Sequence, residues 1–159
     1  MCSWGAAIAA VFAVAAGYQQ AESQKAAARY ENAVAKQNAD VAETQAKYAQ
    51  QLGNIEEERQ RARVRQMLGK QRATFAANNV DASQGTAVDI MGETAMFGEE
   101  DALAIRANAA RQAWGFKVDA NNSRARGKLA LATGKNQATG TYLSTAASVF
   151  NSSYQYAGG

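Results

Sequence analysis

The sequence predicts an all-α protein: a long helical hairpin of coiled-coil-like helices with a loop near residues 78–86, assembling into an oligomeric ring or tube. Three observations support this prediction: none of the 159 residues is proline, alanine recurs at helical spacing, and charge is missing from both ends. An average chain contains about 5% proline, the strongest helix breaker. Alanine, Gln, Glu, Lys and Arg, all abundant here, favour helix.

The two ends of the chain lack charge, since neither residues 1–21 nor residues 136–159 contain Asp, Glu, Lys or Arg. A hairpin would bring these segments side by side. We expect one elongated helical domain, with an uncharged apolar N-terminal segment (1–21), a polar helical segment (22–77), a loop (78–86), returning helices (87–135) and an uncharged C-terminal segment. Because alanine buries little apolar area, stability should come from close helix contacts repeated along the chain or between subunits.

The N-terminal run Trp4–Tyr18, WGAAIAAVFAVAAGY, suits a membrane or a tightly packed subunit interface. Its small residues allow close helix approach. As a helix it would be about 22 Å long, shorter than the ~30 Å hydrocarbon core of a bilayer. A last amphipathic stretch near the C-terminus also gathers large side chains on one face. We predict membrane or oligomer contacts at Trp4, Ile8, Val11, Phe12, Tyr18, Tyr142, Val149, Phe150 and Tyr156.

An alanine stripe follows between Gln19 and Gln51, with steps of three, four or seven residues, the spacing of a coiled-coil seam. Larger side chains, including Tyr48 and Leu52, are expected near this seam. Helix-packing roles are predicted for Ala35, Ala39, Ala42, Ala46, Ala49 and, further along, Trp114.

Turn-forming residues define the expected breaks. Asn, Asp, Ser and Gly cluster in residues 78–86 and predict a loop. Thr86 with Asp89 resembles a capping box that would open a short helix. Further glycines are expected to interrupt or loosen the helices, at Gly53, Gly92, Gly98, Gly134 and Gly140.

A bend centred on Ala82 would pair residues that lie equally far from it along the chain. Arg63, Arg65 and Arg72 then meet Asp101, Glu99 and Glu93, Arg106 and Arg111 approach Glu56, Glu57 and Glu58, and Arg124 falls opposite Asp40. Exposed ion pairs contribute only about 0–1 kcal/mol each, so such pairs would set the register more than the stability. The same pairs could form between neighbouring subunits, and the sequence leaves both arrangements open.

The composition argues against an enzyme. Histidine is absent and Cys2 is the only cysteine, which excludes the familiar Ser-His-Asp and Cys-His arrangements and any intrachain disulfide. The acidic residues 99–101 are better explained as a helix start than as a metal site. No catalytic residue, cofactor or metal is therefore predicted. The apolar N-terminal run does not resemble a secretory signal, because no basic residue precedes it.

The net charge of +3 at pH 7 is weak for a nucleic-acid-binding protein. A basic stretch follows the acidic residues 56–58, and its members are candidates for facing DNA or for charge contacts between subunits. These candidates are Arg59, Arg61, Arg63 and Arg65. A DNA-organising helical protein, which would bind phosphates with a steep salt dependence, stays open as one alternative.

Several motifs in the middle of the chain occur together. They are Ala76-Ala77 leading to Asp81, the turn Ser83–Thr86, the segment Asp101–Arg106 and the aromatic Ala113–Gly115. Together, in the segment Gln71–Lys117, they resemble the small internal virion proteins of short-tailed bacteriophages, also called core or ejection proteins. The opening Met1-Cys2 with Trp4 is similar to that family as well.

This resemblance implies a virion protein that is packaged inside the capsid near the portal and ejected ahead of the genome. With larger internal proteins it would form a conduit across the host envelope, the small protein lying in the outer membrane. The implied partners are further copies of the chain, other internal virion proteins, the portal or tail, the host outer membrane, and genomic DNA that passes through without sequence-specific binding. The alternative is a purely structural virion protein, a helical ring or adaptor near portal and tail that never enters lipid.

Overall fold

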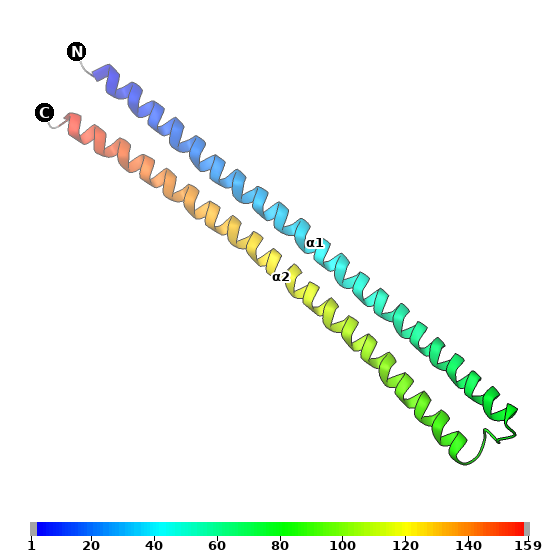
Figure 1. The fold of residues 1–159 in the computed structure, drawn as a ribbon. Helices are drawn as coiled ribbons and strands as arrows, with labels where there is room; N and C mark the ends of the chain where they lie inside the picture. Colours follow the sequence, from blue (N-terminus) through cyan, green and yellow to red (C-terminus); the bar gives the residue numbers. More distant parts are fainter. Residues whose placement is uncertain (1–2, 158–159) are drawn as a thin grey trace. The chain divides into compact units, whose positions relative to one another are not determined.

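The computed structural model describes residues 3–157 of the chain and the side chains of residues 11–151. Two α-helices contain nearly all of these residues: α1 spans Ser3–Ala77 and α2 spans Thr86–Ala157. The two helices pack antiparallel as a hairpin (Figure 1), and the described residues contain no β-strand. The prediction of an all-α hairpin with a loop at this position is confirmed.

The returning half of the chain is one helix, so the prediction of several returning helices is wrong. Gly92, Gly98, Gly134 and Gly140 all lie inside α2, and Gly53 lies inside α1. A glycine in a helix interior costs about 1 kcal/mol relative to alanine. Good helix formers on both sides and packing between the helices can offset this cost.

The C-terminal end of α1 is closed by a Schellman arrangement. Asn79 adopts a positive φ of 56°, and its N–H donates to the carbonyl oxygen of Ala76 at 3.2 Å. The N–H of Val80 donates to the carbonyl oxygen of Phe75 at 2.9 Å. Asparagine here takes the left-handed position that glycine most often holds. The cluster of turn residues therefore acts through a defined helix cap.

The connection to α2 begins with a tight turn and ends on a glycine. Asp81 Oδ1 accepts the N–H of Ser83 at 2.8 Å and its hydroxyl at 2.6 Å, and these bonds lower the pKa of Asp81. Gly85, with a φ of 60°, then accepts the N–H of Val88 at 3.1 Å. The N-cap is therefore Gly85, one residue before the position that the predicted capping box requires.

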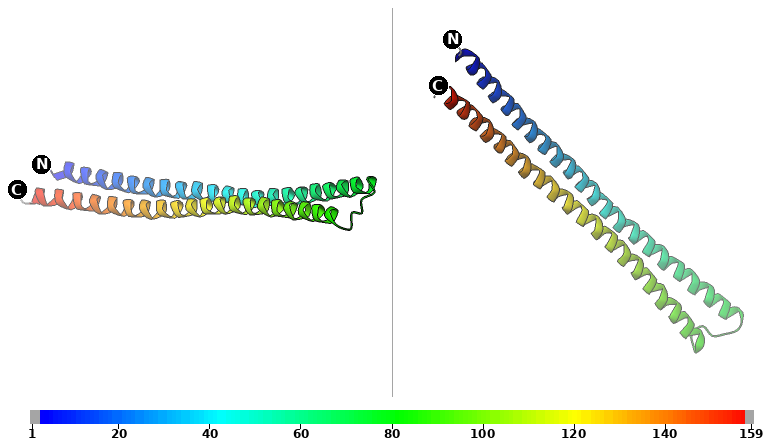
Figure 2. Two further views of the ribbon diagram at one scale, coloured as in Figure 1. Left: turned by 60° about the horizontal axis from the view of Figure 1, so that its bottom comes forward. Right: turned by 60° about the vertical axis from the view of Figure 1, so that its left-hand side comes forward.

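The helix pair divides into two units, each with a part of both helices. The loop unit is Val41–Asp119. The terminal unit combines the described residues up to Asp40 with those from Ala120 onward. In the terminal unit, the first turns of α1 and the last turns of α2 lie side by side, which both views of Figure 2 show.

Small side chains form the contact between the helices in both units. In the loop unit, Ala46, Ala49 and Ala113 form a buried cluster with Phe116 packed against it. The buried alanines are Ala21, Ala28, Ala39, Ala42, Ala46, Ala49, Ala87, Ala102, Ala113, Ala120 and Ala138. Among the described side chains, no large one is fully buried. The alanine seam is thus the core of each unit.

Glycines bring the helix backbones closer than alanine alone would permit. A methyl group at Gly53 would overlap Cβ of Ala109 in the loop unit. In the terminal unit, a methyl group at Gly134 would overlap Cβ of Ala28 and lie 3.2 Å from the carbonyl oxygen of Gln24. Close backbone approach increases the number of dispersion contacts that small side chains can make.

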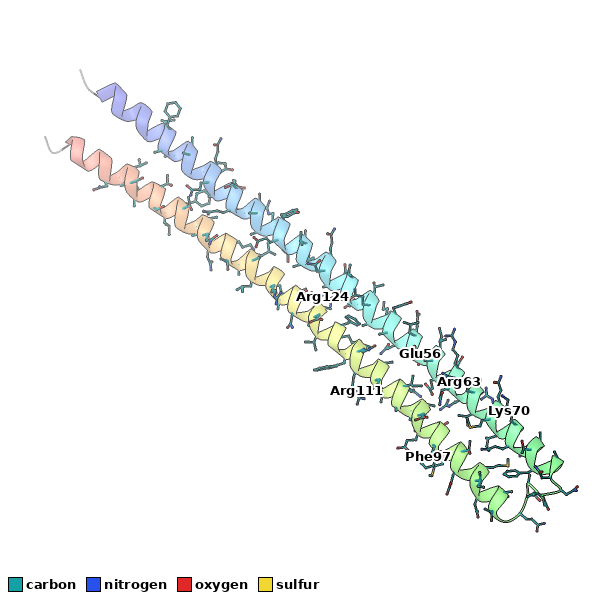
Figure 3. The ribbon with its side chains drawn as sticks, in the orientation of Figure 1. Glu56, Arg63, Lys70, Phe97, Arg111 and Arg124 are labelled. Carbon is teal, nitrogen blue, oxygen red and sulfur yellow. The ribbon has the colours of Figure 1, made fainter. Side chains whose placement is uncertain are left out.

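The register agrees with the predicted bend, although most predicted ion pairs are absent. Arg124 of α2, which Figure 3 labels, lies 3.6 Å from the carboxylate of Asp40, as predicted. Glu99 instead pairs with Arg61, at 2.6 Å. No ion pair in the described part of the chain includes the other predicted arginines, Arg63, Arg65, Arg72, Arg106 and Arg111. Equal distance from the bend fixes the height of a residue but not the side of the helix on which it lies.

Candidate membrane and subunit contact site

The structure brings the two uncharged segments together in the terminal unit. Gly17 of α1 packs directly against Thr145 of α2. The rings of Tyr18 and Tyr142 lie with their centroids 6.2 Å apart. We call the described side chains of residues 11–21 and 136–151 the uncharged end.

Large side chains of the uncharged end point mainly outward. Phe12 is 71% exposed and Phe150 is 68% exposed. Val11, Tyr18 and Val149 line an open apolar depression together with Val14 and Ala15. Tyr142 and Val149 are half-buried beside the seam. The side chains of Trp4, Ile8 and Tyr156, also predicted as contacts, lie outside the described residues.

Hydroxyl groups in the uncharged end of α2 are satisfied by the helix itself. The hydroxyls of Thr139, Thr141, Ser144, Thr145 and Ser148 each donate to a backbone carbonyl three or four residues earlier, at 2.8–3.0 Å. A hydroxyl that is already hydrogen-bonded costs less to remove from water than a free one. The Ser and Thr content therefore makes this helix less polar in effect than its composition indicates.

A three-residue polar cluster closes the uncharged end. Glu22 Oε1 accepts a hydrogen bond from Lys25 Nζ at 2.8 Å and another from the Tyr142 hydroxyl at 3.0 Å. Lys25 Nζ also lies 4.9 Å from the centroid of the Tyr142 ring. The bond from Lys25, and after it that from Tyr142, lowers the pKa of Glu22, while Glu22 raises the pKa of Lys25. The first two charges of α1 thus hold α2 in register where the charge-free region begins.

None of the described helices is both long enough and apolar enough to cross a bilayer. The described residues likewise contain no group of three or more acidic or cysteine side chains arranged to hold a metal ion.

The basic stretch of the loop unit includes one arginine with a structural role. Arg61 donates to both carboxylate oxygens of Glu99 on α2, from Nε at 3.1 Å and Nη2 at 2.6 Å. Its Nη1 lies 3.1 Å from a carboxylate oxygen of Glu57. Glu57 is only 6% exposed and is therefore a buried charged residue. Glu99 raises the pKa of Arg61, and Arg61 lowers the pKa of Glu99. Arg61 therefore links the two helices, whereas Arg59, Arg63 and Arg65 are exposed.

The large side chains expected near the alanine seam lie away from it. Ala35 is half-buried, and the predicted packing residues Ala39, Ala42, Ala46 and Ala49 are buried between the helices. Trp114, predicted to pack with them, is instead 69% exposed, because it follows buried Ala113 and is turned about 100° away from the seam. Tyr48 and Leu52 are exposed as well. Each helix therefore has a small-residue face and a separate large-residue face, which the sequence interpretation missed.

Comparison with known proteins gives no match: no family model, no curated protein and no solved structure aligns significantly with this chain.

Proposed function

We propose that this protein is a bacteriophage internal virion protein that is ejected with the genome, self-associates, and inserts its uncharged end into the host outer membrane as part of a DNA-delivery channel. The observation that carries this proposal is the uncharged end itself. Two charge-free segments from opposite ends of the chain lie side by side there, with Phe12 and Phe150 exposed. The resemblance of Gln71–Lys117 to the phage internal proteins supports the same role.

The energetics of the uncharged end favour transfer to lipid. Burying one exposed Phe, Leu or Val side chain contributes about 1.5–3 kcal/mol. A charged side chain at the centre of a membrane helix costs about 2.5–3.5 kcal/mol, and this region has none. Because no described helix can cross a bilayer alone, we propose that several hairpins insert together, with the hydroxyl-bearing side of α2 toward an aqueous lumen.

Dye-loaded phospholipid vesicles test the membrane role. The full chain should release the dye, and a variant with Phe12→Asp and Phe150→Asp should release it about tenfold more slowly or less, because each new charge opposes insertion. The matched control, Gln51→Asp with Gln84→Asp, adds the same charge at exposed positions of the loop unit and should leak like the natural sequence. Equal leakage from both variants, or none from the full chain, would refute membrane insertion.

The absence of a spanning helix among the described residues favours a second candidate, the purely structural virion protein. In that role the uncharged end would pack against other virion proteins near the portal and tail. The full chain would then form oligomers without releasing dye from vesicles. An image of the virion would show Phe12 and Phe150 covered by protein.

A further inference from the structure

The loop unit carries an outward-facing stripe of large hydrophobic side chains on each helix. The α1 stripe consists of Val41, Tyr48, Leu52 and Ile55, and the α2 stripe consists of Met96, Leu103 and Trp114; these side chains are 40% to 69% exposed. Steps of seven, four, three and eleven residues return to the same side of a helix. The exposed alanines Ala107 and Ala110 continue the α2 stripe between its larger members. Each helix thus has a second packing face that is left uncovered by the described residues of its own chain.

The two stripes lie on opposite faces of the loop unit. Each residue turns an α-helix by 100° around its axis. In the direction in which residue numbers increase, the α1 stripe lies about two-fifths of a turn behind the buried seam of α1. The α2 stripe lies about two-fifths of a turn ahead of the buried seam of α2. Because the helices are antiparallel, these opposite rotations point the stripes to opposite faces. A second copy can therefore place its α2 stripe on the α1 stripe of the first copy and leave its own α1 stripe open. Such a heterologous contact repeats and generates a ring when its rotation closes.

Charges of opposite sign flank the two stripes in their part nearest the loop; farther from the loop, exposed Glu56 lies on the Arg63 side of α1 and exposed Arg111 on the Glu93 side of α2, with the signs exchanged. The α1 side carries Arg59, Arg63 and Lys70, and the α2 side carries Asp89, Glu93 and Glu100; all six are exposed. Figure 3 labels Arg63 and Lys70 along α1. Within the part of the chain that the structure describes, none of the six takes part in an ion pair. This complementarity favours a second copy of the chain over a lipid surface, which offers no matching pattern of carboxylates and cations.

The register within one chain fixes which residues would meet between copies. In a ring of parallel copies all chains lie at the same height, so α1 of one copy meets α2 of the next in the intrachain register. That register places Gly53 opposite Ala109. Between copies it sets Tyr48 against Trp114 and Leu52 against Ala110.

The same register aligns the flanking charges. It sets Arg63 beside Glu100 of the next copy and Lys70 beside Glu93 of the next copy. Within the chain, Arg61 pairs with Glu99 at this height. Arg61 would therefore serve the contact within the chain, and Arg63, two residues later, the contact between copies. Leu52 and Ile55 of α1 face the small residues Ala110 and Ala107, which permits close packing at these positions.

We infer that the α1 stripe of one copy binds the α2 stripe of the next in a head-to-tail contact between parallel chains, bordered by the pairs Arg63–Glu100 and Lys70–Glu93. This inference deepens the self-association part of the proposed function and is independent of the membrane part. It places the contact between copies on the loop unit, so that the uncharged end stays available for contact with lipid or with other proteins.

Paired cysteines test the contact. In a background with Cys2→Ser, one chain carries Tyr48→Cys and a second carries Trp114→Cys. Mild oxidation of the mixture should give a covalent pair containing one chain of each kind, while either chain alone stays uncrosslinked. A chain with both substitutions should form a ladder of multimers. Crosslinking of Tyr48→Cys chains with each other, or none in the mixture, would overturn the head-to-tail contact.

Charge reversal tests the same contact without cysteines. Arg63→Glu and Glu100→Arg should each weaken self-association about tenfold at low salt, and the double variant should recover most of it, since the pair is re-formed with exchanged signs. Arg65→Glu, the same change at another exposed position of α1, should have little effect. Sedimentation velocity measures the association, and circular dichroism verifies that each variant stays helical. A double variant no better than the single ones would refute the pairing, as would a monomeric natural sequence.

The vesicle experiment separates this inference from the membrane role. Crosslinked multimers without dye release would leave the contact standing and remove the channel function. Dye release by a protein that shows no Tyr48–Trp114 crosslink, in solution or on vesicles, would support the membrane role and refute the contact between copies.

Discussion

The loop unit and the terminal unit share the same two helices and the same seam of small residues, but they differ in what surrounds that seam. In the loop unit, exposed large side chains such as Tyr48 and Trp114 belong to stripes that are bordered toward the loop by cations on α1 and by carboxylates on α2. In the terminal unit, charge ends at Glu22 on α1 and Lys135 on α2, and beyond these residues the exposed large side chains have no charged neighbours in sequence.

This difference separates two kinds of recognition. A hydrophobic stripe bordered by charges can select a partner and a register, because a wrong alignment brings like charges together. A hydrophobic surface without charges cannot select an alignment, but it tolerates any apolar environment, including lipid. Both units thus share one seam of small residues, and the roles that we propose for them rest on their different outward faces.

The largest predicted effects on folding come from filling the seam. Gly53→Ala in the loop unit and Gly134→Ala in the terminal unit should each destabilise the protein by about 1–3 kcal/mol, because the added methyl group meets Cβ of Ala109 or of Ala28. Chemical denaturation followed by circular dichroism measures the loss. A similar loss in both units would show that the seam, and not the outer faces, determines their stability.

Two glycines that face open space provide the controls. An added Cβ at Gly69 or Gly140 has no atom within 4 Å among the described residues. Gly69→Ala and Gly140→Ala should therefore stabilise the helices by about 0.5–1 kcal/mol each, the usual gain from replacing a helical glycine. If all four substitutions stabilised the protein, the close backbone approach would be wrong.

The glycines also show what the sequence could and could not predict. The absence of proline, the alanine spacing and the turn cluster at 78–86 were sufficient for the hairpin, its bend and the Asp40–Arg124 pair. Whether a glycine interrupts a helix or packs in a seam depends on the residue opposite it. Gly53 faces Ala109 and Gly92 faces open space, and composition near either glycine does not reveal this.

The placement of the large side chains was the second failure, and it has a related cause. Alanine occurs on several faces of both helices, so its spacing alone does not show which stripe points inward. The choice is made by backbone distance, since only the smallest residues fit where the helices meet. Tyr48 and Trp114 therefore lie on the outer surface of the helices. For the same reason the side of the helix decides the ion pair, and Arg61 rather than Arg65 reaches Glu99.

An intermediate effect is expected from removing the cation that joins the helices of the loop unit. Arg61→Ala breaks the contact with Glu99 and leaves the carboxylate of Glu57 buried without its partner. Leaving a buried charge unpaired is costly, and we expect the Tm to fall by about 2–4 °C or more. The control Arg63→Ala removes an exposed arginine of the same helix and should change the Tm of a dilute sample little. Equal Tm values for both variants would contradict the linking role of Arg61.

In the terminal unit the corresponding change is Lys25→Ala, which removes a cation that contacts Glu22 and Tyr142. Both of these partners stay partly exposed to water. The Tm should therefore fall less than for Arg61→Ala. A larger fall would mean that the boundary of the uncharged end contributes more to folding than the buried Glu57 does.

The smallest effect is a dependence of stability on acid pH. Arg61 lowers the pKa of Glu99 and Lys25 lowers that of Glu22 in the folded state, from an ordinary value of 4.5. A carboxyl group with a lowered folded pKa stabilises the fold above its unfolded pKa, and this contribution is lost as the pH falls through the folded value. The Tm should therefore be nearly constant at neutral pH and decline below about pH 4.5 as these carboxylates are protonated.

Two substitutions assign this decline to a unit. Glu99→Gln in the loop unit and Glu22→Gln in the terminal unit should each lower the Tm at pH 7 and flatten its fall toward pH 3, because the neutral amide has no proton to gain. Glu56→Gln, an exposed carboxylate of α1 without an ion pair among the described residues, should leave the profile unchanged. If Glu22→Gln flattened the profile more than Glu99→Gln, charge pairing would matter most at the edge of the uncharged end, and insertion of that end into lipid would be expected to depend on pH as well.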